Sequence, residues 1–112
     1  MSARVLAVCA AVALAGAALA HRAPAGWEYD PECCSARDCA QVRPGAIREV
    51  AGGYSVVIEP GTHMMVPAGS PRFEAFVPFG DPRIRPSGDE HRHACLSAWR
   101  HLYCIYVPAG SV

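Results

Sequence analysis

Cysteines are the residues of this 112-residue chain whose number and spacing say most about its chemistry. Five of the six lie after residue 20, three close together and two far downstream: Cys33, Cys34, Cys39, Cys95 and Cys104. None of them has the Cys-x-x-Cys spacing of thiol redox enzymes or of structural zinc sites. The pattern therefore predicts a framework of disulfides. Because five is an odd number, at least one thiol is left over, and it is available to link two chains into a dimer.

Two arrangements of these disulfides stay open. Cys33 and Cys34 are a poor pair because a bond between adjacent residues needs a strained ring. We expect Cys95 to pair with Cys104 across a hairpin, which leaves one short-range bridge among the three N-terminal cysteines. In the alternative, Cys95 and Cys104 each bond to one N-terminal cysteine and join the start of the domain to its last strands. In both arrangements the unpaired thiol is one of the three N-terminal cysteines.

Histidines supply a second candidate site, for copper. If the chain is cut before His21, the new amine and the ring nitrogen of His21 form a chelate, and one more imidazole gives a nitrogen site suited to Cu(II). The candidates for that further nitrogen are His91, His93, His63 and His101. In a strand, His91 and His93 would point to the same face. Copper is the alternative to a module that needs no cofactor.

Hydrolysis finds weaker support. Ser87 and Asp89 are followed closely by His91 and His93. Catalytic triads are assembled in space, however, and short strings of this kind more often belong to turns. The residues therefore favour a role other than catalysis.

The first 20 residues are typical of an export signal. Arg4 precedes an apolar run of about 15 residues, and Ala18-Leu19-Ala20 matches a signal peptidase site. The run is shorter than the roughly 20 residues that a membrane-spanning helix needs. We expect cleavage before His21, a single domain over residues 21–112, a periplasmic or secreted location, and no membrane span after cleavage.

The charge of this domain excludes one class of partner. Residues 21–112 contain ten acidic residues and nine arginines, and no lysine. A domain so close to neutral gives no electrostatic case for binding nucleic acid.

The predicted fold is mainly β, a small disulfide-stabilised antiparallel sheet with long loops rich in Pro and Gly. Residues 46–50 and 54–59 have the β-branched and aromatic composition of strands, and 63–66 is expected to complete a three-stranded meander. Residues 67–90 contain many Pro and Gly and are expected to form a loop that covers the sheet. The segment 94–107 is predicted to be a hairpin that ends before a proline.

Large apolar side chains are the candidates for a partner surface. They are Phe73, Phe76, Phe79 and Trp99. In a domain this small we expect most of them in the core. The composition as a whole favours a binding or structural module whose ligand the sequence does not identify.

Two motifs carry a resemblance to a family. They are Cys-Cys-Ser-x-x-Asp-Cys, within the stretch from Trp27 to Cys39, and His-x-Cys…Cys-x-Tyr-Val-Pro, from His93 to Pro108. Together they resemble small exported proteins of alphaproteobacteria, over nearly all of residues 21–112. The resemblance implies an exported, disulfide-containing domain and brings no activity with it. The extra His91 departs from the pattern of the family.

Overall fold

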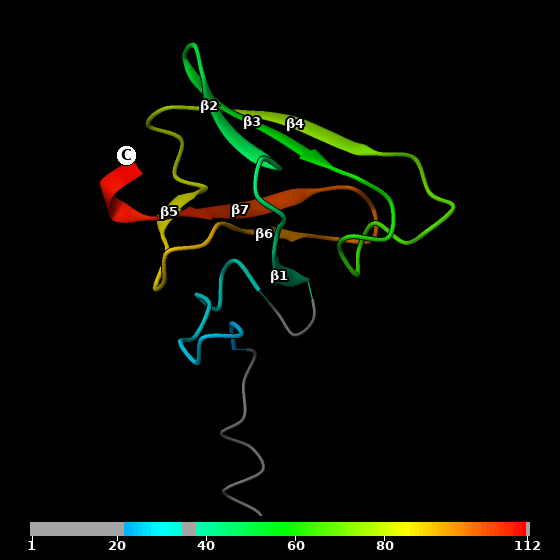
Figure 1. Cartoon of the computed structure of the whole chain (residues 1–112), viewed down its shortest axis with the longest axis horizontal. Helices are drawn as coiled ribbons and strands as arrows, with labels where there is room; N and C mark the ends of the chain where they lie inside the picture. The colour runs from blue at the N-terminus through cyan, green and yellow to red at the C-terminus, as the bar shows by residue number, and fades with distance from the viewer. Residues whose placement is uncertain (1–21, 35–37, 112) are drawn as a thin grey trace, which may run out of the picture.

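The computed structural model describes residues 22–34 and 38–111, and the regular structure within them is almost entirely β. The elements are β1 (Cys39–Gln41), β2 (Ile47–Val50), β3 (Gly53–Ile58), β4 (Phe73–Pro78), β5 (Ile84–Pro86), β6 (His93–Leu96), β7 (Leu102–Val107) and the short 3-10 helix η2 (Ala109–Ser111). The mainly β prediction is confirmed, and the strands form two sheets (Figure 1). The predicted export signal and His21 lie outside the described residues.

The first sheet has the order β2-β3-β4, and all of its pairs are antiparallel. The predicted strands at 46–50 and 54–59 are confirmed as β2 and β3. Gly52, with φ +84°, makes the turn between them because glycine adopts this conformation without steric cost. Alternation along β3 directs Tyr54, Val56 and Ile58 into the core.

The third strand of this sheet is not the one predicted. Residues 63–66 form only an isolated bridge, and β4 lies within the stretch 67–90 that was expected to be a loop. In β4 the buried Phe73 and Val77 alternate with exposed residues, which is the pattern of a strand with one face on the core. Pro78 is the last residue of this edge strand, where the lack of an N–H does not break the sheet.

The second sheet has the order β1-β6-β7-β5, and β5 pairs with β7 in parallel. The predicted hairpin at 94–107 is confirmed as β6 and β7. Between the pairs Cys95–Cys104 and Leu96–Leu102, β7 has one extra residue, Tyr103. This bulge lets both Leu102 and Ile105 face the core between the sheets.

The four-stranded sheet is buried on both faces. Ala94 and Leu96 of β6 contact the core between the two sheets, whereas Cys95 packs into a second cluster formed with the N-terminal segment, residues 22–34. Figure 1 shows this segment on the side of the sheet opposite to β2, β3 and β4. The domain is therefore built in three layers, and all four residues of β6 are buried.

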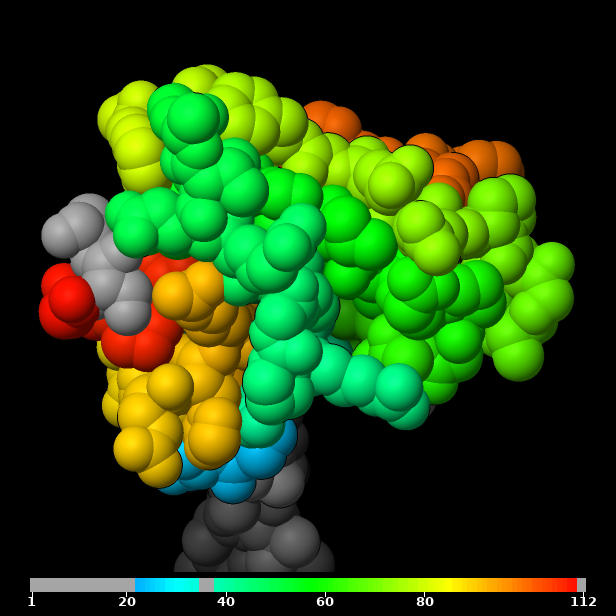
Figure 2. All heavy atoms as spheres, turned by 45° about the horizontal axis from the view of Figure 1, so that its top comes forward, coloured from blue at the N-terminus to red at the C-terminus, as the bar shows by residue number. Residues whose placement is uncertain are grey.

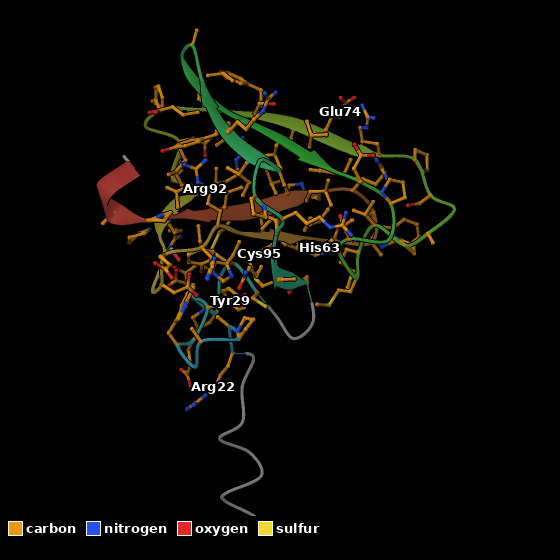
Figure 3. All side chains as sticks on the ribbon, viewed as in Figure 1. Arg22, Tyr29, His63, Glu74, Arg92 and Cys95 are labelled. Atoms are coloured by element: carbon orange, nitrogen blue, oxygen red, sulfur yellow. A yellow bond between two sulfur atoms is a disulfide. The ribbon has the colours of Figure 1, made fainter. Side chains whose placement is uncertain are left out.

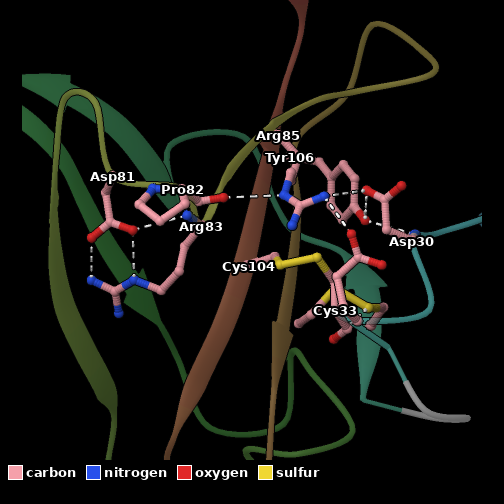
Figure 4. Close-up of a disulfide and its surroundings, with 11 residues drawn as sticks. Asp30, Cys33, Asp81, Pro82, Arg83, Arg85, Cys104 and Tyr106 are labelled. Carbon is pink, nitrogen blue, oxygen red and sulfur yellow. Dashed lines mark hydrogen bonds and ion pairs between the residues drawn. A yellow bond between two sulfur atoms is a disulfide. The ribbon is translucent and has the colours of Figure 1, made fainter.

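Two disulfides join the N-terminal cysteines to the last strands: Cys33–Cys104 and Cys39–Cys95. The expected Cys95–Cys104 pair is wrong, and the structure has the alternative arrangement. The reason is strand order, because β1 lies beside β6 and places Cys39 directly opposite Cys95. Cys34 remains free and buried. Figure 4 shows the Cys33–Cys104 bond beside the charged side chains of Asp30 and Arg85.

Candidate functional site

Hydrogen bonds and aromatic rings join the N-terminal segment to the four-stranded sheet. The Tyr29 hydroxyl lies 2.8 Å from Nδ1 of His93, and Nε2 of His93 lies 3.0 Å from Oδ1 of Asp89. Trp27 Nε1 donates to Oδ2 of Asp89 at 2.8 Å. The Trp27 ring contacts Tyr29, His93 and Tyr106 edge to face, with centroids 4.9 to 5.2 Å away. These contacts hold the segment in a defined position on the sheet.

A second set of contacts lies beside the Cys33–Cys104 disulfide (Figure 4). The Tyr106 hydroxyl donates to Oδ2 of Asp30 at 2.8 Å and accepts from the backbone N–H of Asp30 at 2.9 Å. Arg85 of β5 donates to Glu32 at 2.8 Å and lies 3.5 Å from Asp30. The disulfide is therefore reinforced by polar contacts between the same two parts of the chain.

The titrating groups of this network are shifted by burial and by their hydrogen bonds. Burial alone raises the pKa of Asp89, but hydrogen bonds from His93, Trp27, Ser87 and the His91 N–H hold that pKa well below its usual range. Burial raises the pKa of Tyr29, and the electrostatic influence of Cys34 and Asp89 raises it further. At neutral pH Asp89 is ionised and Tyr29 is protonated.

The network does not have the order of a hydrolytic triad. The Ser87 hydroxyl donates to Asp89 at 3.0 Å, so the carboxylate lies between the serine and His93. A triad needs the imidazole between the nucleophile and the carboxylate. His93 is also fully buried, with 0% of its surface exposed. The arrangement positions the N-terminal segment and gives no catalytic centre.

Of the histidines considered for copper, His21 lies outside the described residues, and His63, His91 and His93 lie in different surroundings. His91 is exposed and precedes β6, whereas His93 is buried, so the prediction that both point to one face of a strand is wrong. His63 Nε2 contacts the Ala94 carbonyl at 2.9 Å, and its Nδ1 accepts from the Met65 N–H. Figure 3 shows His63 apart from Tyr29, whose hydroxyl contacts His93. Both ring nitrogens of His63 and of His93 are already in hydrogen bonds.

Cys34 is the cysteine that the structure leaves unpaired. Its side chain is buried at 7% exposure, and its sulfur lies within 4.8 Å of the Cys39 sulfur and of an Asp38 oxygen. Burial raises the pKa of the thiol to about 12, and a hydrogen bond to Asp38 contributes. The three side chains have the spacing of metal ligands, but the Cys39 sulfur is bonded to Cys95 and does not act as a thiolate.

The aromatic residues proposed for a partner surface divide in the structure. Phe73 is buried in the core between the sheets. Phe76 and Phe79 are exposed by 53% and 49%, and Trp99, in the turn between β6 and β7, by 92%. The expectation that most of them lie in the core is therefore wrong. The core is completed by smaller side chains, which leaves these three rings at the surface.

Phe79 lines a groove of about 590 Å³ where β2 and β3 lie near the segment that joins β4 to β5. Its other lining residues come from β2, β3, β5 and the loop after β4: Glu49, Tyr54, Gly80, Asp81, Pro82 and Ile84. The Phe79 ring contacts the buried Tyr54 ring edge to face, with centroids 5.5 Å apart. Its backbone N–H donates to the Gly52 carbonyl at 3.0 Å. These contacts fix an exposed aromatic ring at the wall of an apolar groove.

A second hollow, of about 530 Å³, lies on the outer face of the three-stranded sheet, which Figure 2 shows at the surface. Its lining includes Arg48, Arg72, Glu59 and Glu74. Arg72 lies 3.0 Å from Glu59 and 3.9 Å from Glu74. Arg72 and the two glutamates are therefore already paired with one another within this hollow.

Sequence reasoning missed the groove because five of its seven lining residues come from the stretch expected to be an irregular loop. One signal was present. Phe73, Ala75 and Val77 are apolar residues at every second position, with Glu74 between the first two, and this spacing favours a strand despite the prolines around it. A strand there would have placed Phe79 directly after its end, beside the turn between β2 and β3.

Comparisons with protein-family models, with curated proteins and with solved structures found no match for this chain. Among the residues that the structure describes, no helix is long and apolar enough to cross a membrane.

Proposed function

We propose that this chain is an exported binding module, stabilised by disulfides, that takes a polypeptide partner in the groove beside Phe79. The partner segment presents an apolar side chain next to a cationic one. The exposed Phe79 ring at the wall of this groove is the observation that carries the proposal. Two disulfides between cysteines far apart in the chain support export, since such bonds persist in oxidising compartments.

The apolar part of the partner is inferred from the walls of the groove. Phe79, Pro82 and Ile84 supply apolar surface, and Tyr54 closes the inner side. Burying one Phe or Leu side chain against such surface contributes about 2 kcal/mol. Large exposed apolar side chains at one place on a soluble domain are typical of interaction sites.

The cationic part is inferred from the charges that line the groove. Both charged lining residues, Glu49 and Asp81, are acidic. Asp81 is paired with Arg83 at 2.9 Å, whereas the structure gives Glu49 no ion pair within the described residues. A positive charge on the partner would contact Glu49 without displacing an existing salt bridge. An anionic group would meet two carboxylates.

A titration with two capped dipeptides tests the groove. The oxidised, 15N-labelled protein is titrated with acetyl-Phe-Arg-amide and with acetyl-Phe-Glu-amide, and binding is followed by NMR. The Arg peptide is expected to shift the amides of Gly80 and Ile84, and the Glu peptide to leave them in place. Equal shifts with both peptides, or shifts confined to another surface, would contradict the proposal.

Two matched variants locate the contact. Phe79→Ala is expected to weaken binding of the Arg peptide about tenfold, which corresponds to the loss of part of one buried ring. Phe76→Ala removes a ring of similar exposure that does not line the groove, and it should leave the affinity unchanged. Glu49→Gln should reduce the preference for Arg over Glu.

Export is tested separately. The full chain is produced with its first 20 residues in a bacterial host, and the mature protein is recovered from the periplasm or the medium. N-terminal sequencing should begin at His21, and mass spectrometry should find two disulfides and one thiol. A cytoplasmic, uncleaved protein with six free thiols would contradict export and would leave the groove experiment unaffected.

A further inference from the structure

All five cysteines between residues 33 and 104 lie in one cluster beneath the four-stranded sheet. Cys39, Cys95 and Cys104 occupy matching positions on the neighbouring strands β1, β6 and β7, so that Cys95 is directly opposite both of the others. Cys33 is bonded to Cys104 from the N-terminal segment, and the free thiol of Cys34 lies within 4.8 Å of the Cys39 sulfur. The Cys34 thiol therefore lies beside the Cys39–Cys95 disulfide. Cys95 in turn lies opposite Cys104, which belongs to the other disulfide.

We propose that this cluster is an internal thiol–disulfide relay that moves the free thiol from Cys34 to the sheet. The Cys34 thiol loses its proton to solvent base, and the thiolate attacks the sulfur of Cys39. A Cys34–Cys39 bond forms, the Cys39–Cys95 bond breaks, and Cys95 leaves as a thiolate that takes up a proton. The step conserves one thiol and two disulfides, so it needs no oxidant or reductant.

A second step of the same chemistry follows from the strand register. Residues directly opposite in an antiparallel pair have Cα atoms about 4.5 to 5.5 Å apart, within the range that a disulfide spans. The Cys95 thiolate attacks Cys104, the Cys95–Cys104 bond forms, and Cys33 leaves as the thiolate. The product has two short-range bridges, and the N-terminal segment is then joined only to the edge strand β1, through Cys34–Cys39, and no longer to β7.

The environment of Cys34 sets the conditions under which the relay runs. An attack within the molecule needs no access from solvent, so the burial of Cys34 does not prevent it. Burial and the Asp38 carboxylate, however, hold the pKa of the thiol near 12 and keep the thiolate scarce at neutral pH. The relay is therefore slow near pH 7 and accelerates with base, because the thiolate is the attacking species.

Tryptic mapping after alkylation follows each step. The oxidised protein of residues 21–112 is incubated at pH 7.5, 8.5 and 9.5, and free thiols are blocked with N-ethylmaleimide before digestion. Cleavage after arginine separates four cysteine peptides: 23–37 with Cys33 and Cys34, 38–48 with Cys39, 93–100 with Cys95, and 101–112 with Cys104. The starting protein gives peptide 23–37 labelled and bonded to 101–112, and 38–48 bonded to 93–100.

The first step is expected to release peptide 93–100 in labelled form and to join the other three peptides through two bonds. The second step is expected to give 93–100 bonded to 101–112. The rate of label transfer should rise about 100-fold from pH 7.5 to 9.5, tenfold for each unit below the pKa of the thiol. Label confined to peptide 23–37 at every pH, with that peptide still bonded to 101–112 and 38–48 still bonded to 93–100, would overturn the proposal.

Two variants and one mixing control test the route. Cys34→Ser keeps both disulfides but lacks the nucleophile, so peptide 93–100 should stay unlabelled. Transfer in this variant would overturn the proposal. In Asp38→Asn, the same rate of label transfer should be reached at a lower pH. A mixture of 15N-labelled and unlabelled protein should give bonds only between peptides of one isotope, and mixed pairs would show exchange between molecules instead of a relay.

Discussion

Removing one disulfide is the perturbation whose cost follows most directly from the fold. The two bridges are nested, because the loop closed by Cys39–Cys95 lies inside the loop closed by Cys33–Cys104. The variants are Cys39→Ala with Cys95→Ala, Cys33→Ala with Cys104→Ala, and the combination of all four. Each replaces both partners, so no new free thiol is created.

The magnitude comes from the lengths of the loops. The bridges span 71 and 56 positions, and each alone would stabilise the domain by about 4 kcal/mol through the entropy of the unfolded chain. When one bridge is intact, the other constrains only the two short segments that separate them, which amount to the 15 positions by which the spans differ. A loop of that length is worth about 3 kcal/mol. Loss of either bridge should therefore cost about 3 kcal/mol, and loss of both about 7 kcal/mol.

Urea unfolding of the oxidised proteins measures these costs. The midpoint of unfolding should fall in each variant, and the dependence of the free energy on urea should steepen because the unfolded chain becomes less compact. A loss of 3 kcal/mol also corresponds to a decrease in Tm of roughly 12 to 24 °C for a domain of this size. Cys34→Ala is the control, since it removes a buried sulfur and keeps both bridges.

One result would refute the reasoning. If the loss in the combined variant equalled the sum of the two separate losses, the bridges would act independently. Their contribution would then come from contacts in the folded protein and not from restriction of the unfolded chain. A loss below about 1 kcal/mol for either bridge would have the same meaning.

Three further perturbations test the contacts around the sheets. Asp89→Asn should lower the free energy of unfolding by about 2 kcal/mol at pH 7, because Asp89 accepts charge-assisted hydrogen bonds. The loss should be smaller at low pH. Since the folded protein lowers the pKa of Asp89, its contribution should begin to decline as the pH falls below about 4 and should be lost as the pH approaches the lowered pKa. Urea unfolding at pH 7 and pH 3 should therefore find a partial loss of this contribution. Burial lowers the pKa of His63, so the unfolded chain binds more protons below pH 6.5 and stability should fall there by up to about 1.4 kcal/mol per unit. His63→Gln should remove that dependence; an unchanged profile between pH 6.5 and 5 would contradict the assignment. Gly88→Ala should cost about 1 to 3 kcal/mol, since the new Cβ would lie 2.5 Å from two ring atoms of Trp27. In a Trp99→Phe background, Gly88→Ala should shift the fluorescence emission of Trp27 to the red. An unchanged spectrum would mean that the Trp27 indole does not lie on Gly88.

The sequence predicts the β2–β3 hairpin well because local features determine it. The apolar residues of β3 alternate, and a glycine stands where the turn needs a positive φ. The β6–β7 hairpin is equally local. The strand β5 has only three residues and pairs in parallel with β7, so its stability comes from a partner about 20 positions away and not from its own composition.

The candidate site was less predictable because it depends on strand order. Local loop-closure entropy favours a Cys95–Cys104 bridge, but β1 beside β6 brings Cys39 to Cys95. The sequence around His93 does not alternate between apolar and polar residues, because both faces of β6 are buried. The groove beside Phe79 requires β2, β3 and β5 to meet at one end of the domain. No short stretch of sequence contains that information.

The Cys33–Cys104 bridge also has a mechanical consequence. A force applied to the two ends of the domain passes from Cys33 directly to Cys104, whose Cα atoms are 5.5 Å apart. The residues between them carry no tension while this bond is intact, and they include every strand except the last three residues of β7. Reduction of this bridge alone would expose the 15 positions by which the two spans differ and add roughly 50 Å of extensible chain, at about 3.4 Å per residue. Reduction of both bridges would expose 71 positions and add roughly 240 Å. The oxidised domain therefore behaves under tension as a short covalent link, and the reduced domain as a long spring.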